Sequence, residues 1–268
     1  MFSTFLLNYL GEQKNFFLFA RKLNNTMNMI DTAPTESNLS GLDRKNFQKN
    51  INSKKTDLYI LKNALGMEVA VTNYGCAILS IMVPDKNGKY ANVILGHDSI
   101  EHVINSPEPF LSTTVGRYGN RIANGKFTLY GEEHQLTVNN GPNSLHGGPT
   151  GFHARVWDAV QPNESTVIFN YTSADGEEGF PGTLEVEMTY RLEDETNAPV
   201  IEYRATTDKA TVVNLTNHGF FNLAGISNPS PTVLNNILTI NADFYVPIDE
   251  VSIPTGEILK VEGTPMDF

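Results

Sequence analysis

Short runs of apolar residues alternate with polar ones along most of this chain, and turn-forming residues separate the runs. The first three runs are Leu58–Leu61, Glu68–Thr72 and Ala77–Val83. Short alternating runs rich in Val and Ile favour β-strands. Clusters of Gly, Pro, Asn and Asp, which favour turns, lie at 63–66, 73–75 and 84–88. We therefore predict strands joined by tight turns.

The same pattern continues to the end of the chain, with little sign of helix. Helical spacing of apolar residues appears only weakly, at 99–105. Further strands are predicted at 92–95, 125–129, 134–138, 156–160, 166–172, 183–192, 200–207, 211–215 and 237–240. Many short strands without interleaved helices are typical of an antiparallel β-sandwich or barrel. We predict an all-β fold in one domain.

The N-terminal part of the chain lacks this pattern. Residues 31–56 are polar, and we interpret them as a linker or N-terminal arm. The apolar start of the chain has no leading basic segment and no small-residue cleavage site, so we predict no secretion signal. Translation from an internal methionine, Met27 or Met29, is an alternative start. We assign residues 1–41 to an N-terminal extension and 42–268 to the domain.

Charge and cysteine content narrow the classes of partner and site. The chain has 19 basic and 30 acidic residues and a formal net charge of -11. This charge disfavours nucleic acid and anionic membranes as partners, and no apolar run reaches the roughly 18 residues that a membrane helix needs. The one cysteine, Cys76, excludes an internal disulfide and a multi-cysteine metal site. Its apolar neighbours favour a buried core residue over a nucleophile.

Three loops rich in Gly and Asn interrupt the strands and contain the candidate chemistry. They are VGRYGNRIANG (115–125), NNGPNSLHGGPTG (139–151) and NLTNHGFFNL (214–223). Loops on a rigid sheet often form ligand sites. Arginine and asparagine side chains offer the donors and acceptors that vicinal hydroxyls need. His218, which follows a predicted strand, can act as a general acid near neutral pH.

Each candidate also has a structural interpretation. A single histidine among aromatic residues, such as His218, is commonly a packed core residue, and Arg117 could be a structural ion-pair partner. No metal-ligand spacing and no Ser-His-Asp set can be assembled. Four other histidines are expected to lie at the surface or in the core: His97, His102, His134 and His153.

Taken together, these loops resemble the aldose 1-epimerase family, the galactose mutarotases. The resemblance runs from about Leu42 to the end of the chain. The matching segments are 73–96, GRYGNRIANGKFTLYG (116–131), NSLHGGPTGFHARVW (143–157), TNHGFFNLAG (216–225) and 243–268. The resemblance implies a large antiparallel β-sandwich and interconversion of the α and β anomers of free aldoses such as galactose and glucose. It implies no metal and no organic cofactor.

The resemblance also implies roles for four residues. His218 matches the general acid that protonates the ring oxygen, and His146 matches the histidine that assists it. Asn120 and Arg121 match the pair that holds substrate hydroxyls. We expect an aldose as the small-molecule partner of a monomeric, cytoplasmic protein.

Two departures from the family pattern leave alternatives open. Gly219 and Phe220 replace the serine and tyrosine that usually follow the acid histidine. The resemblance places the family's glutamate base beyond Phe268, so we expect a truncated sandwich without its C-terminal strands. A non-catalytic carbohydrate-binding pseudoenzyme is therefore the competing hypothesis. An epimerase for phosphorylated hexoses is a third, but we find no additional cluster of Arg or Lys near the loops.

Overall fold

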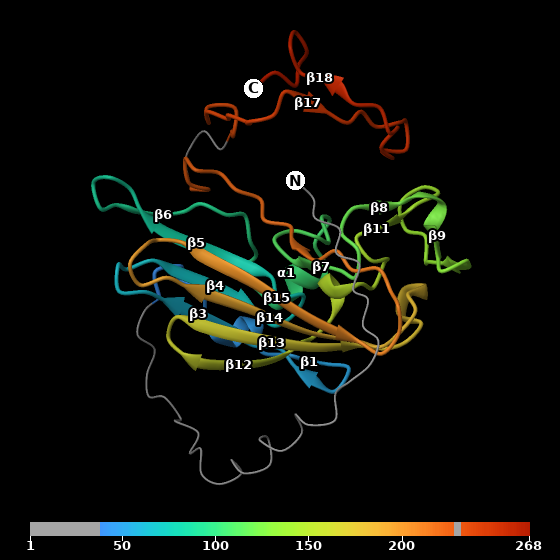
Figure 1. Ribbon diagram of the computed structural model, residues 1–268. Coiled ribbons are helices and arrows are strands. Elements are labelled where there is room, and N and C mark those ends of the chain that lie inside the picture. Colours follow the sequence, from blue (N-terminus) through green and yellow to red (C-terminus); the bar gives the residue numbers. More distant parts are fainter. Residues whose placement is uncertain (1–37, 228–231) are drawn as a thin grey trace.

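Two four-stranded antiparallel sheets lie face to face and enclose the main core (Figure 1). They belong to a computed structural model, which describes residues 38–227 and 232–268. The first sheet contains, in spatial order, β3 (Leu58–Lys62), β4 (Glu68–Thr72), β5 (Ile78–Pro84) and β6 (Tyr90–Asn92). The second contains β12 (Asp158–Asn163), β13 (Thr166–Ser173), β14 (Leu184–Leu192) and β15 (Pro199–Thr207). This confirms the predicted all-β sandwich.

Shorter elements connect and flank the two sheets. The two-stranded pairs are β1 (Asn50–Ile51) with β2 (Lys54–Lys55), β7 (Thr114–Val115) with β16 (Thr216–Asn217), β8 (Arg121–Ile122) with β11 (Ser144–Leu145), β9 (Lys126–Leu129) with β10 (Glu132–Gln135), and β17 (Phe244–Tyr245) with β18 (Leu259–Lys260). The helical turns are α1 (Ile100–Ile104) and the 3-10 turns Arg44–Phe47, Ala123–Gly125, Phe152–Ala154 and Glu177–Gly179. No helix within the described ranges is long and apolar enough to cross a membrane.

The core lies between the sheets because their strands alternate in burial. In β14 every second side chain is buried, from Leu184 to Leu192, and the intervening ones face outward. These side chains meet residues of β3, β4 and β5, among them Leu61, Val69 and Ile78. Full burial of a large apolar side chain contributes about 1.5–3 kcal/mol. Burial of these alternate side chains therefore stabilises the packing of the two sheets.

Strand β4 is buried along its whole length, which alternation alone does not explain. Its second face and that of β5 pack in another apolar cluster, which includes Phe47, Ile100 and Val103. Helix α1 and the turn Arg44–Phe47 contribute these residues, so they cover the outer face of the first sheet.

The linker interpretation of residues 31–56 is wrong for the part that the structure describes. Phe47 is completely buried, and the backbone N–H groups of Leu39 and Ser40 donate to the carboxylate of Glu68 at 2.9 and 3.0 Å. The segment is mostly polar, but Phe47, with Leu42 and Ile51 packed nearby, attaches it to the first sheet. Most of the predicted extension 1–41 lies outside the described residues.

Three predicted strands are also wrong. Of the predicted strand 92–95, only Asn92 lies in a strand, β6, and Ile94 forms an isolated bridge with Phe221. Residues 237–240 form no strand, and Ile237 is 96% exposed, because no segment in the described part of the chain pairs with them. Residues 211–215 form only an isolated bridge, between Asn214 and Tyr118. Local apolar character favours extended backbone, but a strand also needs a partner.

Candidate active site

Short strand pairs bring the three Gly/Asn-rich loops together beside the sandwich (Figure 1). Strand β8 pairs with β11, which places Arg121 opposite Leu145, and β16 pairs with β7. A parallel bridge between Tyr118 and Asn214 connects the first loop to the third. Backbone hydrogen bonds between segments far apart in sequence therefore assemble this region.

Glycine is required where the first and second loops touch. Gly147 has a φ of +85°, and a Cβ atom there would overlap the carbonyl oxygen of Gly116. A Cβ atom at Gly116 would in turn overlap the ring of Phe152. The loops can approach this closely only because both positions lack a side chain.

The close approach puts His146 and His218 side by side. Their ring centroids lie 5.1 Å apart, with an interplanar angle of 84°. Phe220 stacks on His218 at 5.0 Å, and Phe110 packs against His146 at 4.6 Å. Within the described part of the chain, neither ring nitrogen of His218 has a hydrogen-bond partner. Both nitrogens of His218 are thus available to a ligand.

A backbone contact determines the protonation of His146. The N–H of Asn120 donates to His146 Nδ1 at 2.9 Å, and the N–H of His146 donates to the carbonyl of Asn120 at 3.0 Å. Because a backbone N–H can only donate, Nδ1 must be unprotonated. Burial, and then the charges of His218 and Arg121, lower the pKa of His146 from 6.5 to about 4. Near pH 7 the ring is neutral, with its proton on Nε2.

Arg121 lies next to this pair and makes two side-chain contacts. Its Nε donates to Asn140 Oδ1 at 2.9 Å, and its Nη1 reaches Asn120 Oδ1 at 3.4 Å. The backbone N–H of Arg121 donates to the same Asn120 oxygen at 3.0 Å. The structure therefore brings together all four residues that the sequence singled out: Asn120, Arg121, His146 and His218.

Comparison with known proteins identifies the family. Residues 57–268 match the sequence model of the family described as "Aldose 1-epimerase". The chain is 45% identical to a galactose mutarotase of Bos taurus over 202 residues, and 43% identical to an aldose 1-epimerase of Escherichia coli over 211 residues. The chain belongs to the aldose 1-epimerase family.

Solved structures of aldose epimerases agree with this membership. An aldose epimerase homologue from C. elegans superposes with a TM-score of 0.74 at 34% identity, over 80% of this chain and 64% of that one. A galactose 1-epimerase from Lactobacillus acidophilus gives 0.69 at 31% identity, over 82% and 63%. The match with the Bos taurus relative covers 75% of this chain and 57% of that relative. The match with the Escherichia coli relative covers 79% of this chain and 60% of that relative. The chain thus spans less than two thirds of the length of these relatives.

Arg117 has a structural role in this chain. It is 2% exposed, and its guanidinium donates to Ser173 Oγ and to the carbonyls of Ser173, Ala174 and Pro181 at 2.9–3.0 Å. Burial lowers its pKa, and nearby acidic groups such as Glu177 oppose that shift. The structure thus favours a structural role for Arg117 over a ligand contact, but with a hydroxyl and carbonyls as its partners where the sequence suggested an ion pair.

The remaining histidines do not form a second site. His153 is buried, and burial lowers its pKa to about 4; His102 pairs with Asp98 at 2.6 Å, and His134 stacks on Phe127. Burial also lowers the pKa of His97. No group of His, Cys, Asp and Glu in the described ranges could hold a metal ion.

Phe110 belongs to the site, and sequence reasoning missed it. Its ring contacts three histidines: His146 at 4.6 Å, His153 at 4.5 Å and His218 at 6.3 Å. It lies outside all three Gly/Asn-rich loops, so the sequence had no signal for it. Asn140, by contrast, lies in the second of these loops, next to residues that were singled out.

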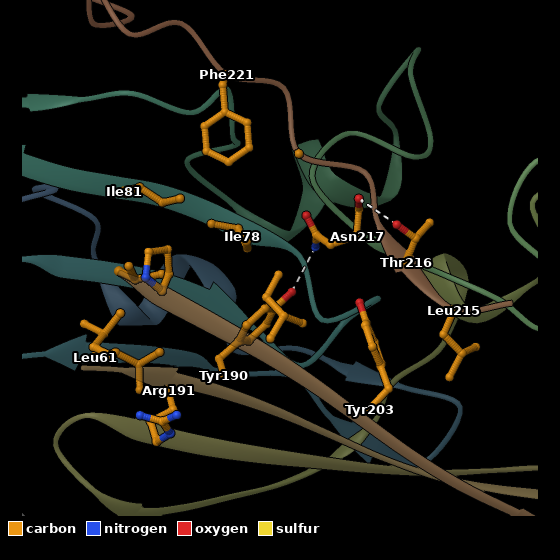
Figure 2. Close-up of a pocket in the computed structure, with 15 residues that line it drawn as sticks. Leu61, Ile78, Ile81, Tyr190, Arg191, Tyr203, Leu215, Thr216, Asn217 and Phe221 are labelled. Atoms are coloured by element: carbon orange, nitrogen blue, oxygen red, sulfur yellow. Dashed lines mark hydrogen bonds between the residues drawn. The ribbon is translucent and has the colours of Figure 1, made fainter. Parts of the chain in front are cut away.

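An apolar cavity of about 400 Å³ lies next to the histidine pair, between the sheets (Figure 2). Three residues around His218 line it, namely Thr216, Asn217 and Gly219, but His218 itself does not. Asn217 Nδ2 donates to the Tyr190 hydroxyl at 3.0 Å. The rest of the lining is mainly apolar and offers few partners for sugar hydroxyls. The histidine pair, with Asn120 and Arg121, is the better candidate for a sugar site.

Proposed function

We propose that this protein is an aldose 1-epimerase that interconverts the α and β anomers of free hexoses such as galactose and glucose. The observation that carries the proposal is the juxtaposition of His146 and His218, 5.1 Å apart, beside Asn120 and Arg121. Family membership supports the same reaction, since the matched relatives are named galactose mutarotase and aldose 1-epimerase.

In the proposed reaction His218 is the general acid. It donates a proton to the ring oxygen while a base removes the proton of the C1 hydroxyl, and the bond between C1 and the ring oxygen breaks. The product is an open-chain aldehyde. Rotation about the bond between C1 and C2 and reversal of both proton transfers give the other anomer. From the resemblance we expect the base to be a glutamate, and we assign this role to no described residue.

His146 assists as a neutral hydrogen-bond donor. Its Nδ1 is occupied by the N–H of Asn120, so Nε2 carries the proton. A ring with a pKa of about 4 is a poor base near pH 7 and remains neutral there. A hydrogen bond from Nε2 stabilises negative charge at the sugar oxygen without transferring a proton. The two histidines thus have different roles.

Asn120 and Arg121 are proposed to hold substrate hydroxyls. Arginine offers donors in a fixed plane, and the asparagine amide can both donate and accept. Phe220 stacks on His218 where the family pattern has a tyrosine, and therefore offers no hydroxyl at that position. We expect the ring of Phe220 to keep His218 in place. We expect the missing hydroxyl to weaken the selection among hexoses.

The first test is polarimetry of freshly dissolved α-D-galactose with the wild-type chain and with His218→Ala. We expect acceleration by the wild type and a loss of about 10²–10⁴-fold in the variant. His102→Ala is the matched control, because His102 is exposed and pairs with Asp98 outside the site. A folded wild type that binds galactose without accelerating mutarotation would favour the carbohydrate-binding alternative.

The monomeric state and the cytoplasmic location of the protein stay predictions.

A further inference from the structure

The second loop presents Asn140 on a closed turn. The N–H of Asn140 donates to the carbonyl of Asn143 at 3.1 Å, and the N–H of Asn143 donates back at 2.9 Å. Gly141, with a φ of +55°, makes this turn possible. Asn143 is 1% exposed, and its side chain bonds the N–H of Asn124 and the carbonyl of Val251. The backbone that carries Asn140 is therefore held from several sides.

From this turn the Asn140 side chain reaches Arg121, 19 residues earlier in the chain. Its Oδ1 accepts from Arg121 Nε at 2.9 Å. A guanidinium is planar, so fixing the direction of Nε–H also fixes the directions of both Nη groups. In this orientation of the guanidinium, Nη1 also contacts Asn120 Oδ1 at 3.4 Å.

We propose that Asn140 is a positioning residue that orients the Arg121 guanidinium towards the hydroxyls of a bound sugar; this rests on the proposed function. An amide oxygen orients the guanidinium without neutralising its charge, as a carboxylate would. The full positive charge then remains available to the oxygens of a neutral ligand. Asn140 is half-buried, and its single partly buried hydrogen bond with Arg121 adds only modestly to stability. Its loss should therefore affect the ligand more than the fold.

The first test observes Arg121 directly and does not depend on activity. The Nε–H resonance of Arg121, assigned with Arg121→Lys, should exchange slowly with solvent in the wild type. In Asn140→Ala the exchange should be faster and the resonance shifted, while Asn140→Asp should restore slow exchange because it keeps an acceptor. Asn163→Ala is the matched control, since Asn163 Oδ1 also accepts hydrogen bonds, from Ser165 in the loop between β12 and β13. An unchanged resonance in Asn140→Ala would overturn the proposal.

The second test measures the consequence for galactose. We expect Asn140→Ala to raise KM for galactose about tenfold with little change in kcat, because a hydrogen bond to a charged group is affected. In an Arg121→Ala background the same substitution should have no further effect, since Asn140 acts through Arg121. Asn140→Asp should recover only part of the loss, because its carboxylate orients the guanidinium but also neutralises its charge.

The outcomes separate this inference from the proposed function. A wild type that neither binds galactose nor accelerates its mutarotation would contradict the proposed function, and the exchange rates would still decide whether Asn140 orients Arg121. An active wild type whose KM is unchanged in Asn140→Ala would overturn the inference alone. Additive effects of the two substitutions would also overturn it, because they would show that Asn140 acts independently of Arg121.

Discussion

At the scale of single residues, the lowered pKa of His146 makes the stability of the folded protein depend on pH. The folded protein holds the pKa of His146 at about 4, against 6.5 ordinarily, and burial is the main cause. Between these values the unfolded chain binds more protons than the folded one. The free energy of unfolding should therefore be highest above pH 6.5 and should decrease as the pH falls towards 4. His153, with a pKa of about 4, contributes in the same direction.

Urea denaturation at pH 7 and pH 4.5 checks this prediction. The wild-type midpoint should be lower at pH 4.5, and the decrease should be smaller in His146→Asn. Asparagine keeps an acceptor near the position of Nδ1 for the N–H of Asn120, but it does not titrate. Equal decreases in both proteins would show that His146 does not contribute. His102→Asn should behave as the wild type does.

At the scale of elements, Arg117 attaches the first loop to the second sheet. Its four hydrogen bonds reach Ser173 at the end of β13, as well as Ala174 and Pro181. Arg117→Leu leaves buried carbonyl groups without donors, so we expect it to lower the free energy of unfolding by about 3 kcal/mol. Arg204→Leu on the exposed face of β15 is the control and should cost under about 0.5 kcal/mol. Equal midpoints in a urea titration would contradict this role of Arg117.

At the scale of the whole molecule, the two sheets leave the apolar cavity of about 400 Å³ between them. Apolar dyes bind such surfaces, so the folded protein should enhance the fluorescence of the dye ANS. Ile201→Asp, which puts a charge in the cavity lining, should reduce the enhancement while the far-UV circular dichroism stays unchanged. Val160→Asp is the control, because Val160 is exposed on β12 away from the cavity. Equal fluorescence in both variants would place the dye elsewhere.

Sequence patterns predicted the long strands best. Strands β13, β14 and β15 lie where the alternation predicted them, because a regular period of two over eight or nine residues fits few other structures. Helix α1 also lies within the predicted 99–105. The two-residue pairs that assemble the site, such as β8 with β11, were not predictable, since their stability comes from partners distant in sequence.

Some features of the candidate site were likewise predictable from the sequence, and others were not. The sequence by itself determined the all-β class, which depends on local pattern, and it pointed to His146 and His218 by residue type. Its resemblance to the aldose 1-epimerase family implied the roles of these histidines and of Asn120 and Arg121. Only the tertiary structure decided that Phe110 packs beside the histidines and that Asn140 bonds Arg121. It also decided the tautomer of His146, through one backbone N–H from another loop. Hydrogen bonding and burial depend on contacts between residues that are distant in sequence, and these contacts cannot be predicted from the local sequence.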